Sequence, residues 1–176
     1  MNSADLQKQI NNHEAWLKAT SDGPAAAAGA PLSLEGEILR DVRLCGMHLS
    51  LAHLSGSKLI DCRFQKCNFF RSEIIRATLE NCQFIGCDLS KSDLTNAIAT
   101  NCDFTDSNFT RADLTGANLA GTVLTNCIFD WSWLVETDLR NCDLTGIRLE
   151  NARLSKTKMY NNRKGLHDVE RSTPRA

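Results

Sequence analysis

A five-residue period runs through the middle of this chain and constrains its fold more than any other feature. From Leu34 to Met159, every fifth residue is a large apolar side chain at 25 of 26 positions, the exception being Ala99. The residue two positions earlier, from Cys62 to Cys142, is always Cys, Ser, Ala or Thr, and the residue in between is often Asp or Asn. A period of five fits neither an α-helix, at 3.6 residues, nor a β-strand, at 2.

A short extended segment followed by a corner accounts for this pattern. On an extended segment the small and the large residue, two apart, point to one side, and the Asp or Asn between them points to the other. The remaining two residues of each five turn the corner. A single coil of this kind cannot bury its own apolar face, so we expect successive coils to stack on one another.

Two segments, 112–116 (ADLTG) and 117–121 (ANLAG), resemble the A(D/N)LXX motif of the pentapeptide-repeat family. The resemblance covers residues 32–161 and implies an all-β fold, a right-handed quadrilateral parallel β-helix with 20 residues in each coil. The 26 repeats then give about 6.5 coils, and at ~4.8 Å per coil the rod is roughly 30 Å long. The motif indicates little about function, because its residues build the rod and the family's members do different things.

The two ends differ from the repeat and are predicted to form separate segments. Residues 1–22 predict a short amphipathic capping helix, with Leu6, Ile10 and Leu17 on one side and Trp16 beside them. An open β-helix needs such a cover, because exposed strand edges pair with other chains. Residues 23–31, rich in Ala, Gly and Pro, predict a linker, and residues 162–176 predict a polar, disordered tail.

Composition and terminal sequence features indicate a cellular compartment for this protein, but they do not indicate the class of its binding partner. The net charge is −1, which by itself indicates no class of partner. The sequence has no 18-residue apolar run that would span a membrane, and its first residues lack the features of a secretory signal. The segment His13 to Leu17 (HEAWL) resembles the lead-in of bacterial pentapeptide-repeat proteins. We therefore expect a cytoplasmic bacterial protein in a reducing compartment.

The eight cysteines are explained by the repeat. With 20 residues in a coil they stack in two inward columns, the first containing Cys62, Cys82, Cys102 and Cys142 and the second Cys67, Cys87 and Cys127. Stacked parallel side chains neither converge on a zinc ion nor face one another as disulfides require. We expect these seven thiols to be buried and reduced, which leaves Cys45, outside the inward register, as the candidate reactive thiol.

No catalytic motif is evident. The sequence contains no Ser-His-Asp order, no P-loop and no glycine-rich dinucleotide motif. A metal site formed by Cys45, His48 and His53 is conceivable, but solvated surface residues are the favoured interpretation of all three. We expect no enzymatic activity, no cofactor and no bound metal.

Acidic residues gather in the middle of the repeat. Residues 86–145 contain nine acidic and three basic residues, a net charge of −6, and Glu73, Asp93 and Asp113 are predicted to stack in one outward column. Some members of the family resemble duplex DNA in width and charge and bind type II topoisomerases such as DNA gyrase, so DNA mimicry is the alternative hypothesis for function. Against it, basic residues continue the surface, and the unbroken register leaves no room for the loops often found in quinolone-resistance members. Direct binding of nucleic acid is not expected.

Large apolar side chains break the outward pattern near the C-terminal end of the repeat. They are Ile128, Trp131, Trp133 and Val135, and stacking places Arg111, Arg148 and Arg153 beside them. Exposed Trp flanked by Arg is typical of binding hot spots; the structural alternative is an indole that covers the backbone of a corner. Our principal hypothesis is a non-catalytic scaffold that holds a protein at this corner, either a second copy of the chain or a foreign partner.

Overall fold

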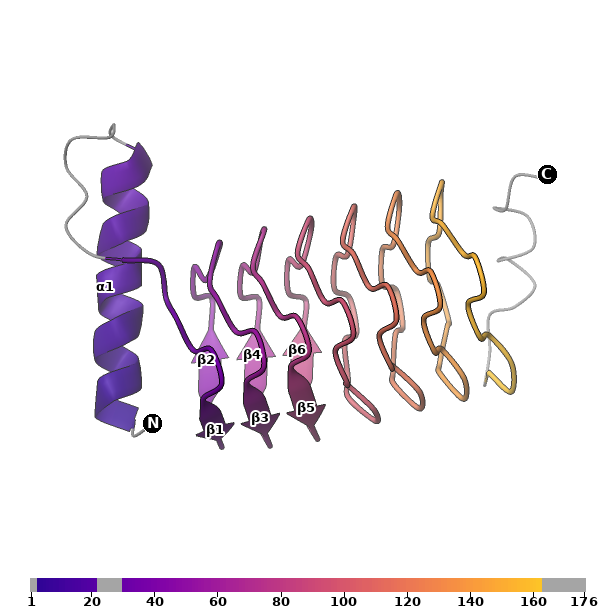
Figure 1. Cartoon of the computed structure of the whole chain (residues 1–176), viewed down its shortest axis with the longest axis horizontal. Coiled ribbons are helices and arrows are strands. Elements are labelled where there is room, and N and C mark those ends of the chain that lie inside the picture. The colour runs from indigo at the N-terminus through magenta and orange to yellow at the C-terminus, as the bar shows by residue number, and fades with distance from the viewer. Residues whose placement is uncertain (1–2, 22–29, 163–176) are drawn as a thin grey trace.

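A computed structural model describes residues 3–21 and 30–162 and shows one helix at the end of a straight stack of coils (Figure 1). The helix α1 spans Ser3–Ser21. The stack is a right-handed, four-sided parallel β-helix, which confirms the predicted fold class. The strands β1 (Ile38–Arg40), β3 (Lys58–Ile60) and β5 (Thr78–Glu80) form one parallel sheet, and β2 (Arg43–Cys45), β4 (Arg63–Gln65) and β6 (Gln83–Ile85) form a second.

Coils are joined in a fixed register of 20 residues. Ile38 pairs with Lys58 in the strands, and isolated parallel bridges continue the same register elsewhere, as between Asp93 and Asp113. We number the four faces by their outward residues. Face 1 carries Ser33, His53, Glu73, Asp93, Asp113, Trp133 and Arg153, whereas faces 2, 3 and 4 begin at Ile38, Arg43 and His48.

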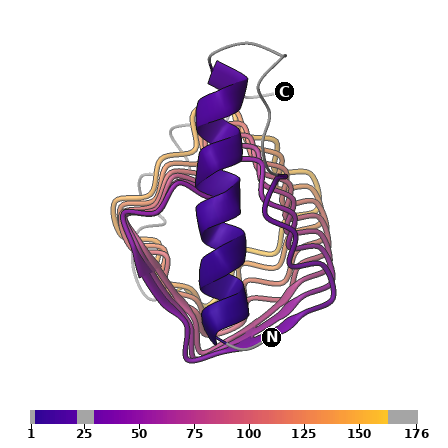
Figure 2. The same ribbon diagram turned by 90° about the vertical axis from the view of Figure 1, so that its left-hand side faces the viewer.

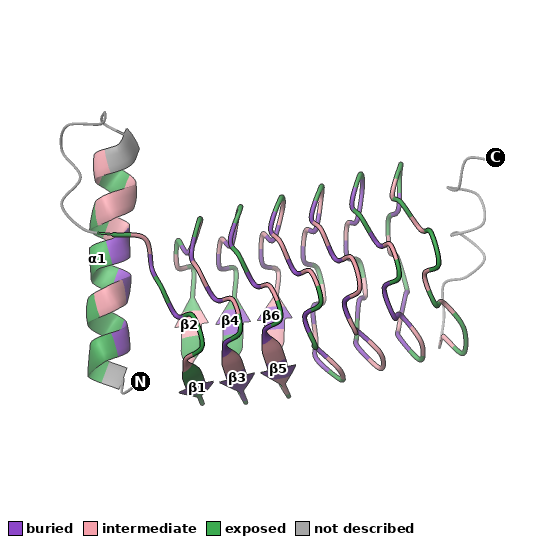
Figure 3. Ribbon diagram, in the orientation of Figure 1, coloured by how far each residue is buried: buried purple, intermediate pink, exposed green. Residues whose placement is uncertain are grey.

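The interior of the rod is one continuous apolar core. Every fifth large residue from Leu49 to Leu149 is buried, and Figure 3 shows the inward positions buried along the stack. Phenylalanine rings of successive coils stack on one another, with centroids 4.7 Å apart for Phe109 and Phe129 and 5.2 Å apart for Phe84 and Phe104. Each coil therefore gains its core from its neighbours.

Every corner contains one residue in the left-handed conformation. The backbone angle φ is positive at every fifth residue from Gly36 to Asn161. Around Gly56, for example, the Ser57 N–H donates to the Leu54 carbonyl at 3.1 Å, as in a turn whose third residue has positive φ. Gly, Asn and Asp occupy most of these positions, because they adopt this conformation at the least cost.

The outward Asp and Asn residues support the corners. One side-chain oxygen accepts a hydrogen bond from the backbone N–H two residues later, at 2.9 Å for Asp93 with Thr95 and 2.9 Å for Asp113 with Thr115. The side chain thereby satisfies a polar group of the turn that follows it. Much of the acidity of this surface is therefore structural.

The helix α1 lies across the N-terminal end of the coils (Figure 2). Leu6 and Ile10 are buried as predicted, Trp16 and Leu17 are half-buried, and His13 is completely buried. The His13 Nδ1 accepts the N–H of Leu32 at 2.9 Å, so this imidazole satisfies a backbone donor of the first coil. No helix within residues 3–21 and 30–162 is long and apolar enough to cross a membrane. Most of the predicted linker and tail lies outside the described residues.

The pH dependence of capping tests this role of His13. Burial lowers the pKa of His13 below its ordinary 6.5, Glu14 opposes the shift and His53 adds to it. The folded state therefore favours the neutral ring, and the stability it contributes is complete above about pH 6.5 and is lost as the pH falls through the lower folded pKa. Between about pH 8 and pH 5, the urea midpoint should fall more for the wild type than for His13→Gln, which keeps an acceptor and does not titrate. Equal falls would contradict this role.

At Ala99, one inward position of the repeat lacks a large side chain. Ala99 is completely buried in the column of Leu79 and Leu119, whereas Ile98 is 46% exposed, so Ile98 does not turn inward to replace the missing side chain. The outward bridge from Ile98 to Thr78 and Asn118 fixes its direction. We predict that Ala99→Leu is neutral or stabilising in thermal unfolding, because the equivalent inward position is Leu in both neighbouring coils. The matched change Ala97→Leu, at a buried small position, should lower the free energy of unfolding by roughly 1–3 kcal/mol. Equal losses of stability in the two variants would show that no space for a larger side chain remains at Ala99.

Candidate functional site

The seven predicted interface residues lie around one corner, but on two sides of it. Trp131 occupies the corner between faces 4 and 1 and is 54% exposed, whereas Trp133 lies on face 1 and is 46% exposed. Ile128 and Val135 are half-buried, and Arg111, Arg148 and Arg153 are exposed. Neither indole covers the core, so both offer apolar surface to a partner.

The arginines near the two indoles have different roles. The Arg153 guanidinium carbon lies 4.5 Å from the centre of the Trp133 ring, a cation–π contact. Arg148 instead forms an ion pair with Asp130, which is buried and also accepts the N–H of Glu150 at 3.0 Å. In the sequence Asp130 is only one of the nine acidic residues of 86–145, and no local signal shows that it anchors Arg148 beneath the corner.

An open groove of ≈ 480 Å³ runs along the face 4 side of Trp131. Its charged and aromatic lining consists of Lys91, Arg111, Asp130, Trp131, Arg148 and Glu150. Because Arg148 is paired with Asp130, the unpaired positive charge of the groove comes from Lys91 and Arg111. Lys91 was absent from the predicted interface, although its position 20 residues before Arg111 would have indicated it.

The edge that contains Trp131 differs from the other three edges of the rod. From Leu51 to Trp131 its left-handed residues are Leu51, Arg71, Lys91, Arg111 and Trp131, none of which is Gly, Asn or Asp, and Asn151 follows only in the last coil. The edge from Asp41 to Asn161, by contrast, consists of those three residue types alone. Long side chains at left-handed positions cost stability. We call these five residues the Leu51–Trp131 edge.

The three residues of the acidic strip lie in successive coils of face 1. Bridges join Glu73 to Asp93 and Asp93 to Asp113 on face 1. Asp93 and Asp113 each use one oxygen in a corner, as described above, and Glu73 Oε2 lies 3.0 Å from His53 Nδ1. The strip borders the cationic middle of the Leu51–Trp131 edge, so stripes of opposite charge lie side by side.

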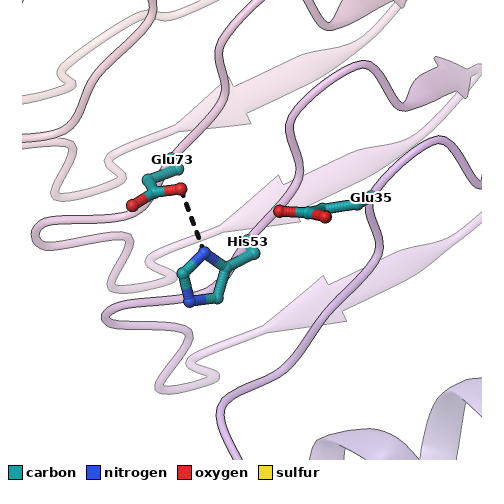
Figure 4. A group of neighbouring side chains, drawn as sticks. All are labelled: Glu35, His53 and Glu73. Atoms are coloured by element: carbon teal, nitrogen blue, oxygen red, sulfur yellow. Dashed lines mark hydrogen bonds and ion pairs between the residues drawn. The ribbon is translucent and has the colours of Figure 1, made fainter.

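His53 belongs to a small polar cluster at the N-terminal end of face 1 (Figure 4). Glu35, His53 and Glu73 hold their potential ligand atoms within 4.8 Å of one another, whereas ligands around a tetrahedral ion lie only about 3.4 Å apart for bonds of about 2.1 Å. His53 and Glu73 contact each other directly through a hydrogen bond between adjacent coils. The predicted alternative grouped His53 with Cys45 and His48, but the cluster in the described part of the chain groups it with the two glutamates.

The cysteines adopt the predicted arrangement. Seven are buried and Cys45 is exposed, and all eight are free thiols. The buried thiols also donate to a carbonyl of the preceding coil, with Sγ to oxygen distances of 3.4 Å from Cys82 to Leu59 and 2.9 Å from Cys127 to Phe104. Burial raises the pKa of the Cys127 thiol to about 12, so it stays protonated and unreactive.

Thiol reactivity tests this arrangement. A native titration with a thiol reagent should detect one rapidly reacting group, Cys45, because burial protects the other seven. Denaturation should then release all eight, and Cys45→Ser should remove the rapid phase alone. Co-purified zinc, or several disulfides after reducing preparation, would contradict the packing role of the cysteine columns.

Comparisons with known proteins agree on the fold. A family model described as pentapeptide repeats matches eight copies, over residues 38–74, 72–111, 102–141 and 134–161. No curated protein matches the chain. Among solved structures, full-length QnrB1, a plasmid-mediated fluoroquinolone resistance protein, is 17% identical with a TM-score of 0.56, over 68% of this chain and 73% of that chain. Rfr23, a pentapeptide repeat protein from the cyanobacterium Cyanothece 51142, is 21% identical with a TM-score of 0.34, over 74% of this chain and 88% of that chain. The similarity to QnrB1 shows a common fold and no more.

Proposed function

This chain belongs to the pentapeptide-repeat family, and from that premise we propose that it is a non-catalytic scaffold that binds a protein at the Trp131 corner. The family supplies the rod, and the outward residues supply recognition. The grooves beside this corner are open, whereas catalytic sites are usually enclosed pockets that exclude water. A convex rod with exposed aromatic and cationic side chains suits a binding role.

The backbone of Trp131 carries the proposal. Its φ is 62°, in the left-handed region, and its indole is 54% exposed. A bulky residue in this conformation costs about 1 kcal/mol or more, and the exposed indole recovers little of that cost by packing within the rod. The fold needs a left-handed residue at this corner but not a bulky one, and backbone strain of this kind is common at functional sites.

A substitution of Trp131 separates its effect on stability from its role in binding. Trp131→Asn should raise the free energy of unfolding by roughly 1 kcal/mol, because Asn adopts the left-handed conformation more readily. The same change should weaken partner capture at least about tenfold, since Trp is the residue type most enriched in hot spots. The measurements are a thermal melt and a pull-down from the native host with mass spectrometry.

A matched control uses Ile98, which is 46% exposed on face 2 and remote from the corner in the coil register. Ile98→Asn should leave capture unchanged. If Trp131→Asn lowers stability instead of raising it, or if capture survives the change, the indole is structural and the proposal is wrong.

DNA mimicry of a type II topoisomerase substrate remains the alternative. It would use Glu73, Asp93 and Asp113, but Arg71, Lys91 and Arg111 lie two residues before them on the same coils and interrupt the negative surface. Direct titration with DNA gyrase at low and high salt tests it, because an electrostatic mimic should bind tightly at low salt and weaken steeply as salt rises.

A further inference from the structure

Two neighbouring columns of the surface are complementary to each other, rung by rung. Each coil places one residue of the Leu51–Trp131 edge two positions before one outward residue of face 1. The rungs are Leu51 with His53, Arg71 with Glu73, Lys91 with Asp93, Arg111 with Asp113, and Trp131 with Trp133. Three rungs thus carry a cation beside an acid, and one carries two indoles.

Within the described residues the cations of the edge are not paired with the acids of face 1, although Glu73 contacts His53. In residues 3–21 and 30–162, no ion pair joins Arg71, Lys91 or Arg111 to any carboxylate. Arg71 and Lys91 lie instead near the Phe70 ring, 5.5 Å and 5.2 Å from its centre. On the acidic side, Asp93 and Asp113 direct one oxygen to the corner N–H, which leaves the other oxygen for a partner.

A second copy of the chain presents these charges at the correct spacing. In a parallel side-by-side pair, a two-fold axis along the rods would set the edge column of each copy against the face 1 column of the other at the same height. Both columns repeat once per coil, so every rung meets its counterpart without sliding. An antiparallel pair related by a two-fold axis across the rods would instead bring Arg71 against Arg111, which is repulsive.

We propose that the chain forms a parallel, side-by-side homodimer through these two columns. The proposal rests on the binding role of the Trp131 corner and names its partner, a second copy of the chain. Arg71, Lys91 and Arg111 of each copy meet Glu73, Asp93 and Asp113 of the other, and Trp131 of each copy packs against Trp133 of the other.

The two kinds of contact contribute differently to this dimer. Exposed ion pairs add little affinity, but they fix the register and exclude the antiparallel arrangement. The two indole contacts supply most of the binding energy. Five rungs at ~4.8 Å span only about 20 Å, so the interface is small and the dimer should be weak and salt-sensitive.

A charge swap at one rung tests the proposal. Arg71→Glu and Glu73→Arg both change outward residues, and neither position holds a corner through its side chain. Each single variant places like charges opposite each other at two symmetry-related rungs, so its dimer dissociation constant should rise at least about tenfold. The double variant should regain the wild-type value. A mixture of the two single variants should form heterodimers with every charge matched again.

Sedimentation velocity at low salt measures the wild type, the three variants and the mixture, and circular dichroism confirms that each is folded. A wild type that stays monomeric at high concentration overturns the dimer, as does a dimer that either single variant leaves unchanged or a mixture that fails to associate. A monomeric chain that still captures a foreign protein through Trp131 overturns the dimer and leaves the proposed function standing. The chain could instead capture no other protein and form a charge-dependent dimer that persists in Trp131→Asn. This result would support dimerisation through the charged columns, but it would remove Trp131 from the proposed function.

Discussion

One left-handed residue at every corner closes each coil after 20 residues, and the rest of the structure depends on this closure. Because the coils are of equal length, the backbone N–H groups outside the turns meet carbonyls one coil away, and each inward side chain meets its equivalent. Some of the corners are also tightly packed: a Cβ added to Gly116 would lie 2.5 Å from Asn96 Oδ1. Backbone pairing, core stacking and surface columns are therefore three results of one geometric condition.

The sequence was sufficient to predict everything that repeats. The alternation of small and large residues indicated which side chains are inside, and the coil length then placed the cysteines and the acidic strip in their columns. Features that occur once were harder. His13 and Asp130 became buried because each meets a particular neighbour, a backbone N–H in one case and Arg148 in the other. His13 lies outside the repeat and Asp130 at one of its corner positions, and no periodic argument locates the partner of either residue.

The strained edge was missed for a different reason. The residues that turn the corners were treated as interchangeable, whereas the structure gives the second of them a specific backbone requirement. With that requirement known, Trp131 stands out in the sequence alone, because most equivalent positions hold Gly, Asn or Asp. The direction of Ile98 likewise follows from backbone pairing and not from the space beside Ala99.

The fixed coil length also limits how such a surface can evolve. Arg71 and Trp131 share an edge because a whole number of coils separates them. Insertion of a single five-residue repeat between them would preserve the core, yet it would turn all later residues by a quarter of the circumference relative to the earlier ones. Trp131 would then leave the edge that carries the cations, and Trp133 would leave the face that carries the acids. Lengthening of this rod is thus neutral for recognition only in steps of one complete coil, and a relative with an extra half coil would display the same residues in a different constellation.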